Sequence, residues 1–137
     1  MTVLLVDAAN VVGSRPDGWW RDRAGATGRL LGRLVALTGS SMTGPDGGVL
    51  VCDEVVAVVE GQARGVAAPD GVRVERAPGS GDDALAVCAA RLAEEGRPLL
   101  VVTADRGLRA RLPSGAAVTG PGWLVARLDE IGCAPPA

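Results

Sequence analysis

An apolar segment that ends on an acidic residue opens this chain and constrains its fold more than any other feature. Residues 3–6 read Val-Leu-Leu-Val and lead directly to Asp7. An uninterrupted β-prone run without polar alternation is typical of a strand that helices cover on both faces. A second such run, residues 99–102, leads to Asp105. Because ligands of open parallel sheets bind outside the carboxyl ends of the strands, both acids are predicted to lie where chemistry takes place.

Alternating strand and helix patterns continue along the chain. Asp22 is expected to cap a helix with an apolar stripe at Leu30, Leu31, Leu34 and Leu37. Further helices are expected over residues 84–95, 106–112 and 121–131. Further strands are expected over residues 49–52, 55–59, 72–75 and 116–118. Loops are expected over residues 13–23, 38–48 and 61–71. This alternation predicts a single-domain, three-layer α/β/α sandwich with a mostly parallel central sheet over residues 1–132, followed by a short tail at 133–137.

The absence of two residue types removes several reaction classes. The chain has no histidine, and all 14 of its basic residues are arginine. A Walker A loop and Schiff-base chemistry need lysine, and Ser-His-Asp or Cys-His sites need histidine. Carboxylate chemistry is what the composition leaves.

The cysteines and the hydropathy indicate a protein of the cytoplasm. Cys52, Cys88 and Cys133 are odd in number and far apart, a pattern that signals neither a disulfide framework nor a zinc site. No window approaches the roughly 20 uninterrupted apolar residues that a membrane-spanning helix needs. With no recognisable leader ahead of the first strand, a cytoplasmic location without membrane contact is expected.

The acids in the middle of the chain add to the two at the strand ends. Asp82 and Asp83 are predicted to open a helix, and parallel topology brings strand ends and helix starts to the same edge of a sheet. Asp7 and Asp105 would then converge with them. Since like charges a few ångströms apart raise one another's pKa, such a cluster is typical of a site for a hard divalent cation, Mg²⁺ or Mn²⁺. A metal-activated water would supply the nucleophile that the missing histidine and lysine cannot.

Three segments, in this order, resemble the PIN-like/NYN family of metal-dependent ribonucleases: VDAANVV at residues 6–12, GSGDDAL at 79–85 and VVTADRGL at 101–108. The resemblance implies the PIN-like sandwich and Mg²⁺- or Mn²⁺-dependent cleavage of RNA phosphodiester bonds. The residues that it places in the site are Asp7 with Asn10, Asp82 or in the alternative register Asp83, and Thr103 with Asp105.

The chain departs from the family at one position. Many members carry a further acid two residues after the third Asp, where this chain has Gly107. Glu60, at the end of the second central strand, is a candidate replacement as a metal ligand. Simple helix capping is the competing interpretation for Asp82, Asp83 and Asp105. It is less suited to Asp7, which by its sequence has no helix to cap until Asp22.

A net charge of −2 argues against binding of nucleic acid through the overall field of the protein, so contacts with RNA must be local. The candidates for phosphate binding are Arg15, Arg21, Arg106 and Arg109, with surface solvation as the alternative. Trp19 is a candidate for stacking on an unpaired base, with core packing as its alternative, and Trp123 is expected in the core.

The function predicted from these patterns is a metal-dependent endoribonuclease. The alternatives are a catalytically weak PIN-like domain that binds RNA or a protein partner, and a small nucleotide phosphohydrolase. RNA is the expected partner, and the family resemblance makes a homodimer a candidate assembly. The sequence identifies no inhibitor.

Overall fold

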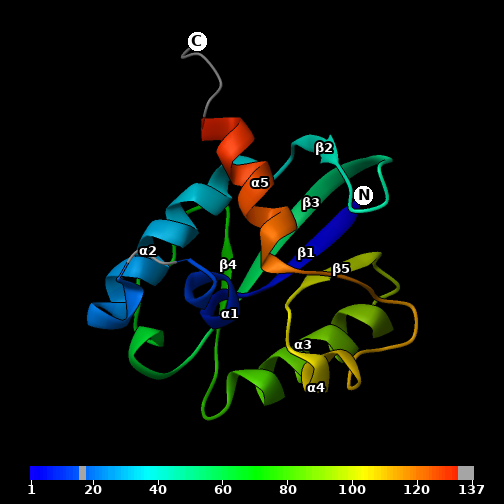
Figure 1. Ribbon diagram of the computed structural model, residues 1–137. Coiled ribbons are helices and arrows are strands. Elements are labelled where there is room, and N and C mark those ends of the chain that lie inside the picture. The colour runs from blue at the N-terminus through cyan, green and yellow to red at the C-terminus, as the bar shows by residue number, and fades with distance from the viewer. Residues whose placement is uncertain (16–17, 133–137) are drawn as a thin grey trace.

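The computed structural model describes residues 1–15 and 18–132, so the predicted tail at 133–137 lies outside the described residues. A six-stranded sheet forms the middle layer, with helices on both faces (Figure 1). The strands are β1 (Thr2–Asp7), β2 (Ser41–Thr43), β3 (Val49–Val59), β4 (Arg73–Arg76), β5 (Leu99–Val102) and β6 (Ala117–Thr119). The helices are α1 (Ala8–Gly13), α2 (Arg23–Leu34), α3 (Gly81–Glu94), α4 (Arg106–Arg109) and α5 (Pro121–Gly132), with 3₁₀ turns at Trp19–Arg21, Val35–Leu37 and Gly61–Ala63.

The sheet runs in the order β2-β3-β1-β5-β6, and β4 pairs with the second half of β3, whereas β2 pairs with its first residues. All pairs are parallel except β2 with β3. The predicted three-layer α/β sandwich with a mostly parallel sheet is therefore confirmed. Because β1 lies between β3 and β5, its carboxyl end is the centre of one sheet edge.

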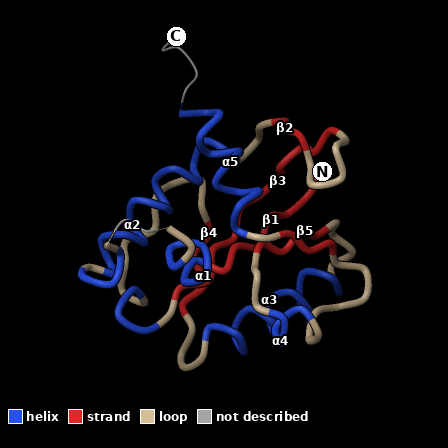
Figure 2. The backbone as a smooth tube through the Cα atoms, in the orientation of Figure 1, coloured by secondary structure: helices blue, strands red, loops and turns tan. Residues whose placement is uncertain are grey.

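Successive side chains of each strand point to opposite faces of the sheet, so the core has two layers. Along β1, Leu4 and Val6 face the layer that α1, α2 and α5 cover, whereas Val3 and Leu5 face the layer that α3 and α4 cover (Figure 2). All four are at most 1% exposed, which is why the strand reads as an unbroken apolar run. The predicted leucine stripe of α2 and the turn after it is buried in the first layer.

The segment around residues 38–59 differs from the prediction. Residues 49–52 and 55–59 form one continuous strand, β3, and both acids in between, Asp53 and Glu54, pair with Arg97 at 2.9 Å. The predicted loop at 38–48 contains β2, which pairs with the first part of β3. Trp123 is half-buried against the core, and its indole N–H donates to the Thr43 carbonyl at 3.1 Å. The guanidinium of Arg127 donates to the same carbonyl at 3.1 Å, so two hydrogen bonds anchor β2 to α5.

Smaller differences concern the ends of helices. The helix predicted at 84–95 begins at Gly81, and the one predicted at 106–112 is a single turn that ends at Arg109. Asp22 caps α2 as predicted, with its carboxylate accepting the Gly25 N–H at 2.9 Å. Within the part of the chain that the structure describes, every helix is too short or too polar to cross a membrane.

Candidate active site

Four acids lie where the central strands end, and we call them the acidic edge: Asp7, Glu60, Asp82 and Asp105. Asp7 is the last residue of β1 and pairs with Val58 of β3, so Glu60 follows it on the neighbouring strand. Asp105 follows β5, and Asp82 lies in the first turn of α3. Parallel topology is what brings these distant parts of the chain together.

Asp7 ends a strand and begins a helix. One carboxylate oxygen, Oδ1, accepts the backbone N–H of Asn10 at 3.3 Å, which makes Asp7 the N-cap of α1. The prediction that Asp7 has no helix to cap before Asp22 is therefore wrong. Residues 8–13 are too few to show a helical repeat, and the cap is formed where the buried strand turns out of the sheet.

The surroundings of Asp7 disfavour the ionised form of its carboxyl group. Burial raises the pKa of its carboxyl above the ordinary value of 3.8, although the hydrogen bonds from Asn10 and Thr103 lower it. The negative charges of Asp82 and Glu60 raise the pKa further. A carboxylate held beside like charges binds a cation more readily than a solvated one does, because the cation relieves the repulsion.

Thr103 connects the two strand-end acids. Its side chain is fully buried, its hydroxyl donates to Oδ2 of Asp7 at 3.0 Å, and its Oγ1 accepts the N–H of Asp105 at 3.1 Å. Arg109 donates from its guanidinium to the Thr103 carbonyl at 3.0 Å, from one turn further along the chain. Thr103 is thus a positioning residue whose single hydroxyl sets the spacing of Asp7 and Asp105.

Asn10 and Asp105 both bond to backbone groups of the segment after β5. Oδ1 of Asn10 accepts the N–H of Ala104 at 2.8 Å, which ties α1 to this segment. Oδ1 of Asp105 accepts the N–H of Leu108 at 2.9 Å, so the predicted cap on α4 is confirmed. Capping occupies Oδ1 and does not prevent Oδ2 of Asp105 from ligating a cation.

Glu60 joins the end of β3 to the start of α3. Its Oε2 accepts the N–H of Gly81, the first residue of the helix. Ser80 is the N-cap of α3 and accepts the N–H groups of Asp82 at 3.2 Å and Asp83 at 3.5 Å. The alternative interpretation of these two acids as N-caps is therefore wrong, since both lie in the first turn.

The two neighbouring acids of α3 have different surroundings. Asp83 is exposed and pairs with Arg111 at 2.8 Å. Asp82 is partly buried, and its charge acts on the pKa of Asp7. Of the two, Asp82 is the one that the fold directs toward the acidic edge.

The acids of this edge are oxygen donors, the ligand type that Mg²⁺ and Mn²⁺ prefer. Among the described residues, however, no three or more acid or cysteine side chains are already grouped closely enough to hold a metal ion. Mg²⁺ commonly keeps several waters and binds through one or two carboxylates together with substrate phosphates. The donor set fits such an open site better than a closed protein cage.

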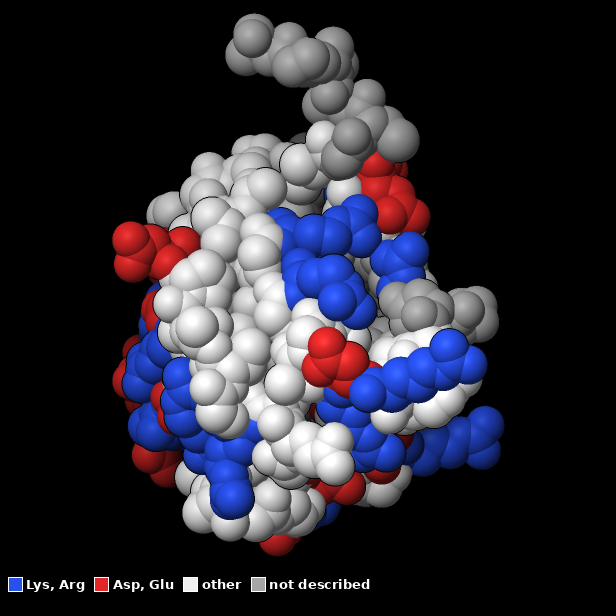
Figure 3. Space-filling view, turned by 90° about the vertical axis from the view of Figure 1, so that its left-hand side faces the viewer, with Lys and Arg blue, Asp and Glu red and all other residues white. Residues whose placement is uncertain are grey.

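Several arginines lie after α1 or at the starts of α2 and α4. Arg15, Arg21, Arg23 and Arg106 form no ion pair with any described residue. Figure 3, which looks at the side where α2 lies in Figure 1, shows basic side chains in several groups with uncharged surface between them. The predicted phosphate-binding residues Arg15, Arg21 and Arg106 are thus free of competing carboxylates in the described part of the chain, whereas Arg109 already bonds to a carbonyl.

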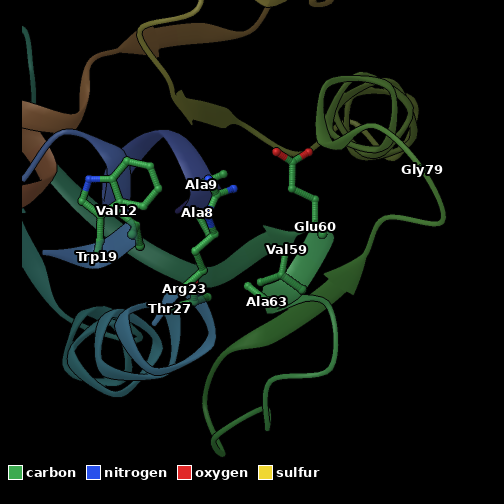
Figure 4. Close-up of a pocket in the computed structure, with 11 residues that line it drawn as sticks. Ala8, Ala9, Val12, Trp19, Arg23, Thr27, Val59, Glu60, Ala63 and Gly79 are labelled. Carbon is green, nitrogen blue, oxygen red and sulfur yellow. The ribbon is translucent and has the colours of Figure 1, made fainter. Parts of the chain in front are cut away.

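A pocket opens beside the acidic edge, and we call it the Trp19 pocket (Figure 4). Its volume is about 220 Å³. Trp19 lies at one end, Glu60 at the other, and Arg23 between them (Figure 4). The remaining lining residues are small or apolar: Ala8, Ala9, Val12, Thr27, Val59, Gly61, Ala63 and Gly79. The guanidinium of Arg23 lies 5.1 Å from the centre of the Trp19 ring.

Sequence reasoning missed the parts of the site that act through the backbone. Neither Ser80 as the cap of α3 nor Gly81 as the partner of Glu60 was predicted. A Cβ at Gly81 would collide with the Glu60 carboxylate, so this glycine is required by close approach. Ser80 and Asp83 have the spacing of a capping box, and that signal could have identified the helix start.

Comparisons with known proteins support the fold. No protein-family model matches the sequence, and no curated protein matches it. Among solved structures, the crystal structure of a mutant of Rae1 (YacP) from Bacillus subtilis is similar, with a TM-score of 0.68 and 18% sequence identity. The match covers 96% of this chain and 77% of that chain. The chain therefore shares the α/β sandwich fold of Rae1 (YacP), along nearly its whole length.

Proposed function

We propose that the protein is a metal-dependent ribonuclease of the PIN-like/NYN type that hydrolyses RNA phosphodiester bonds at the acidic edge. The observation that carries this proposal is the state of Asp7. A carboxylate is kept partly buried, with a raised pKa, beside the charges of Asp82 and Glu60. An arrangement that costs stability in the free protein is typical of functional sites.

The residues divide into cation ligands and positioning groups. Asp7, Asp82 and Asp105 would hold Mg²⁺ or Mn²⁺, with Glu60 as a further donor through the oxygen that does not bond to Gly81. When bound, the cation would acidify a water for attack on phosphorus and neutralise charge on the phosphate. Asp82 is proposed instead of Asp83 as the ligand, because Asp83 is exposed and already paired with an arginine.

The chain's own hydrogen bonds fix the geometry in which the acids would act. Thr103 holds Oδ2 of Asp7 and the backbone of Asp105 with one hydroxyl, so neither acid can shift without the other. Asn10 fixes the segment between them through Ala104. Preorganised groups of this kind need not rearrange as charge develops in the transition state.

The free arginines fit the substrate. Arg15, Arg21 and Arg106 can donate bidentate hydrogen bonds to backbone phosphates on either side of the scissile bond. These local contacts would bind RNA in spite of the net charge of −2, because phosphate neutralisation depends on the groups near the strand. Endonucleolytic cleavage of single-stranded RNA is the activity that an open edge of this kind would support.

The proposal is tested by Mg²⁺ and Mn²⁺ titration calorimetry together with cleavage of a labelled single-stranded RNA. Asp7→Asn is expected to lose metal binding and cleavage. Asp70→Asn is the matched control, because Asp70 is exposed and lies in a loop away from the edge. Metal binding without cleavage would instead indicate a weakly active RNA-binding domain, which the glycine at position 107 makes the second candidate. No metal binding by the wild type would refute the proposal.

A further inference from the structure

The Trp19 pocket has the size of a single aromatic ring system. Its volume is about 220 Å³. A cavity of roughly 150 Å³ is sufficient to hold benzene, whereas pockets for drug-sized ligands span roughly 300–1,000 Å³. One nucleobase therefore fits, and the attached sugar and phosphate would remain outside the pocket.

The aromatic wall of the pocket is held in place from several sides. Trp20 packs edge-on against Trp19, with ring centres 6.0 Å apart and planes at 87°. Gly13 at the end of α1 lies against the Trp19 ring, since a Cβ there would be 3.8 Å from it. Arg23 is set at the first position of α2 by the Asp22 cap, and its guanidinium covers Trp19. A planar base can extend this stack of two planar groups without any rearrangement of the wall.

The pocket adjoins the acidic edge. Ala8 and Ala9 line it and directly follow Asp7 in the chain. Glu60 belongs to both, and Figure 4 shows Trp19 and Glu60 at opposite ends of the pocket with Arg23 between them. Gly81 occupies Oε2 of Glu60, so Oε1 is the oxygen that can accept an N–H from the edge of a base when it does not ligate a cation.

We propose that the Trp19 pocket is a nucleobase-binding subsite, which holds one unpaired base of the substrate so that the adjacent phosphate reaches the acidic edge. This inference rests on the proposed function for its biological role, but binding of the base itself depends only on the pocket. The base stacks on the Trp19–Arg23 pair, and the apolar floor excludes water from its other face. Such a site accepts a base only from a single-stranded or unpaired stretch, which restricts where the protein acts on RNA.

The test measures nucleotide binding without divalent cations and without turnover. The indole N–H signals of the wild type are followed by NMR during titration with AMP, GMP, CMP or UMP, and with ribose 5-phosphate as the probe that lacks a base. At least one nucleotide is expected to shift the Trp19 signal and to bind about 10-fold or more tightly than ribose 5-phosphate. Equal binding of ribose 5-phosphate would overturn the proposal, because phosphate contacts would then explain all of the affinity.

Variants separate stacking from general effects on the loop. Base–aromatic stacking of ~1–3 kcal/mol predicts that Trp19→Ala weakens nucleotide binding about 5- to 150-fold, measured by calorimetry since the reporting indole is lost. Val87→Ala is the control: Val87 is 66% exposed and does not line the pocket, so this substitution is expected to change binding less than about 2-fold. Ala9→Leu fills the pocket from α1 and is expected to abolish binding while thermal unfolding stays cooperative.

The outcomes for the subsite and for the nuclease are distinguishable. Nucleotide binding that needs Trp19, in a protein that cleaves no RNA, would support the subsite and refute the nuclease. Cleavage that needs Asp7, with binding unaffected by Trp19→Ala and Ala9→Leu, would refute the subsite and keep the nuclease. If Trp19→Ala does not fold, Ala9→Leu alone decides between these outcomes.

Discussion

Removal of the Thr103 hydroxyl should disturb the site and the fold together. Thr103→Val keeps the size and the β-branch of the side chain but deletes the group that donates to Asp7 at 3.0 Å and accepts from Asp105 at 3.1 Å. Since Thr103 is fully buried, no water can take the place of the hydroxyl at the same point. Both partners then lose a hydrogen bond through one substitution.

The expected loss of stability follows from the two hydrogen bonds that the Thr103 hydroxyl makes. A hydrogen bond to a charged group contributes ~1.5–3 kcal/mol and a neutral one ~1 kcal/mol. Asp7 and Asp105 are only partly buried, so solvent can recover part of the loss from the far side of each. We therefore expect Thr103→Val to lower the free energy of unfolding by about 2–3 kcal/mol. Thr103→Ser keeps the hydroxyl and loses one methyl group, which costs about 1 kcal/mol.

The same substitution should shift the pH dependence of activity. The hydrogen bond from Thr103 lowers the pKa of Asp7 against the larger effect of burial. Without it, the pKa of Asp7 rises further, and the carboxylate that must be ionised to bind a cation forms only at higher pH. The acidic limb of the pH–rate profile is therefore expected to move to higher pH in Thr103→Val and to stay in place in Thr103→Ser.

Urea denaturation and RNA cleavage across pH measure the two effects. The reasoning predicts the stability order wild type, Thr103→Ser, Thr103→Val, with an unchanged dependence on urea concentration. A valine variant as stable as the serine variant would show that the hydroxyl does not connect the two acids. An unshifted acidic limb would show that this hydrogen bond does not control the pKa of Asp7.

Three further substitutions test other parts of the site. Asp7→Asn should raise the thermal midpoint at neutral pH while it abolishes cleavage. Because burial raises the pKa of Asp7, the stability of the wild type falls as the pH rises through that pKa. The higher thermal midpoint of the variant should therefore vanish as the pH falls toward the ordinary pKa of 3.8. Gly81→Ala should destabilise the protein by ~1–3 kcal/mol in urea, since the new Cβ collides with a carboxylate, whereas Gly79→Ala, with open space around it, should not. Calorimetry should show that Asp82→Asn weakens Mn²⁺ binding about 10-fold or more. Asp83→Asn removes only an exposed ion pair, so it should change stability by ~0–1 kcal/mol and leave Mn²⁺ affinity within about 2-fold. Equal losses of Mn²⁺ affinity in the two variants would refute the choice of Asp82 as the ligand.

Local patterns in the sequence predicted the architecture well where burial is uniform. β1 and β5 are covered on both faces, so their apolar runs have no polar interruption and could be recognised without the structure. The cap of α2 at Asp22 was equally local, because a capping residue and the amide that it accepts lie within one turn. Alternation of such elements was sufficient for the fold class.

Prediction was poorer where a distant residue decides the local structure. Asp53 and Glu54 seemed to divide β3, but the strand continues through them beside β1, and Arg97, two residues before β5, pairs with both. β2 forms because β3 and α5 lie beside it, and its own composition is that of a loop. Such partners cannot be found from nearby residues, because the Arg97–Asp53 and Trp123–Thr43 contacts span 44 and 80 residues of the chain.

The acids of the site could be named from the sequence, but their roles could not be separated. The strand ends and the family resemblance identified Asp7, Asp105 and the Asp82–Asp83 pair as candidates. Only the tertiary structure distinguished Asp82 from Asp83, made Thr103 the connection between two strands, and enclosed a pocket between Trp19 and Glu60. The physical reason is that residue type and local pattern determine which chemistry a side chain can perform, whereas its pKa, its partners and the space beside it depend on groups that meet only when the sheet assembles.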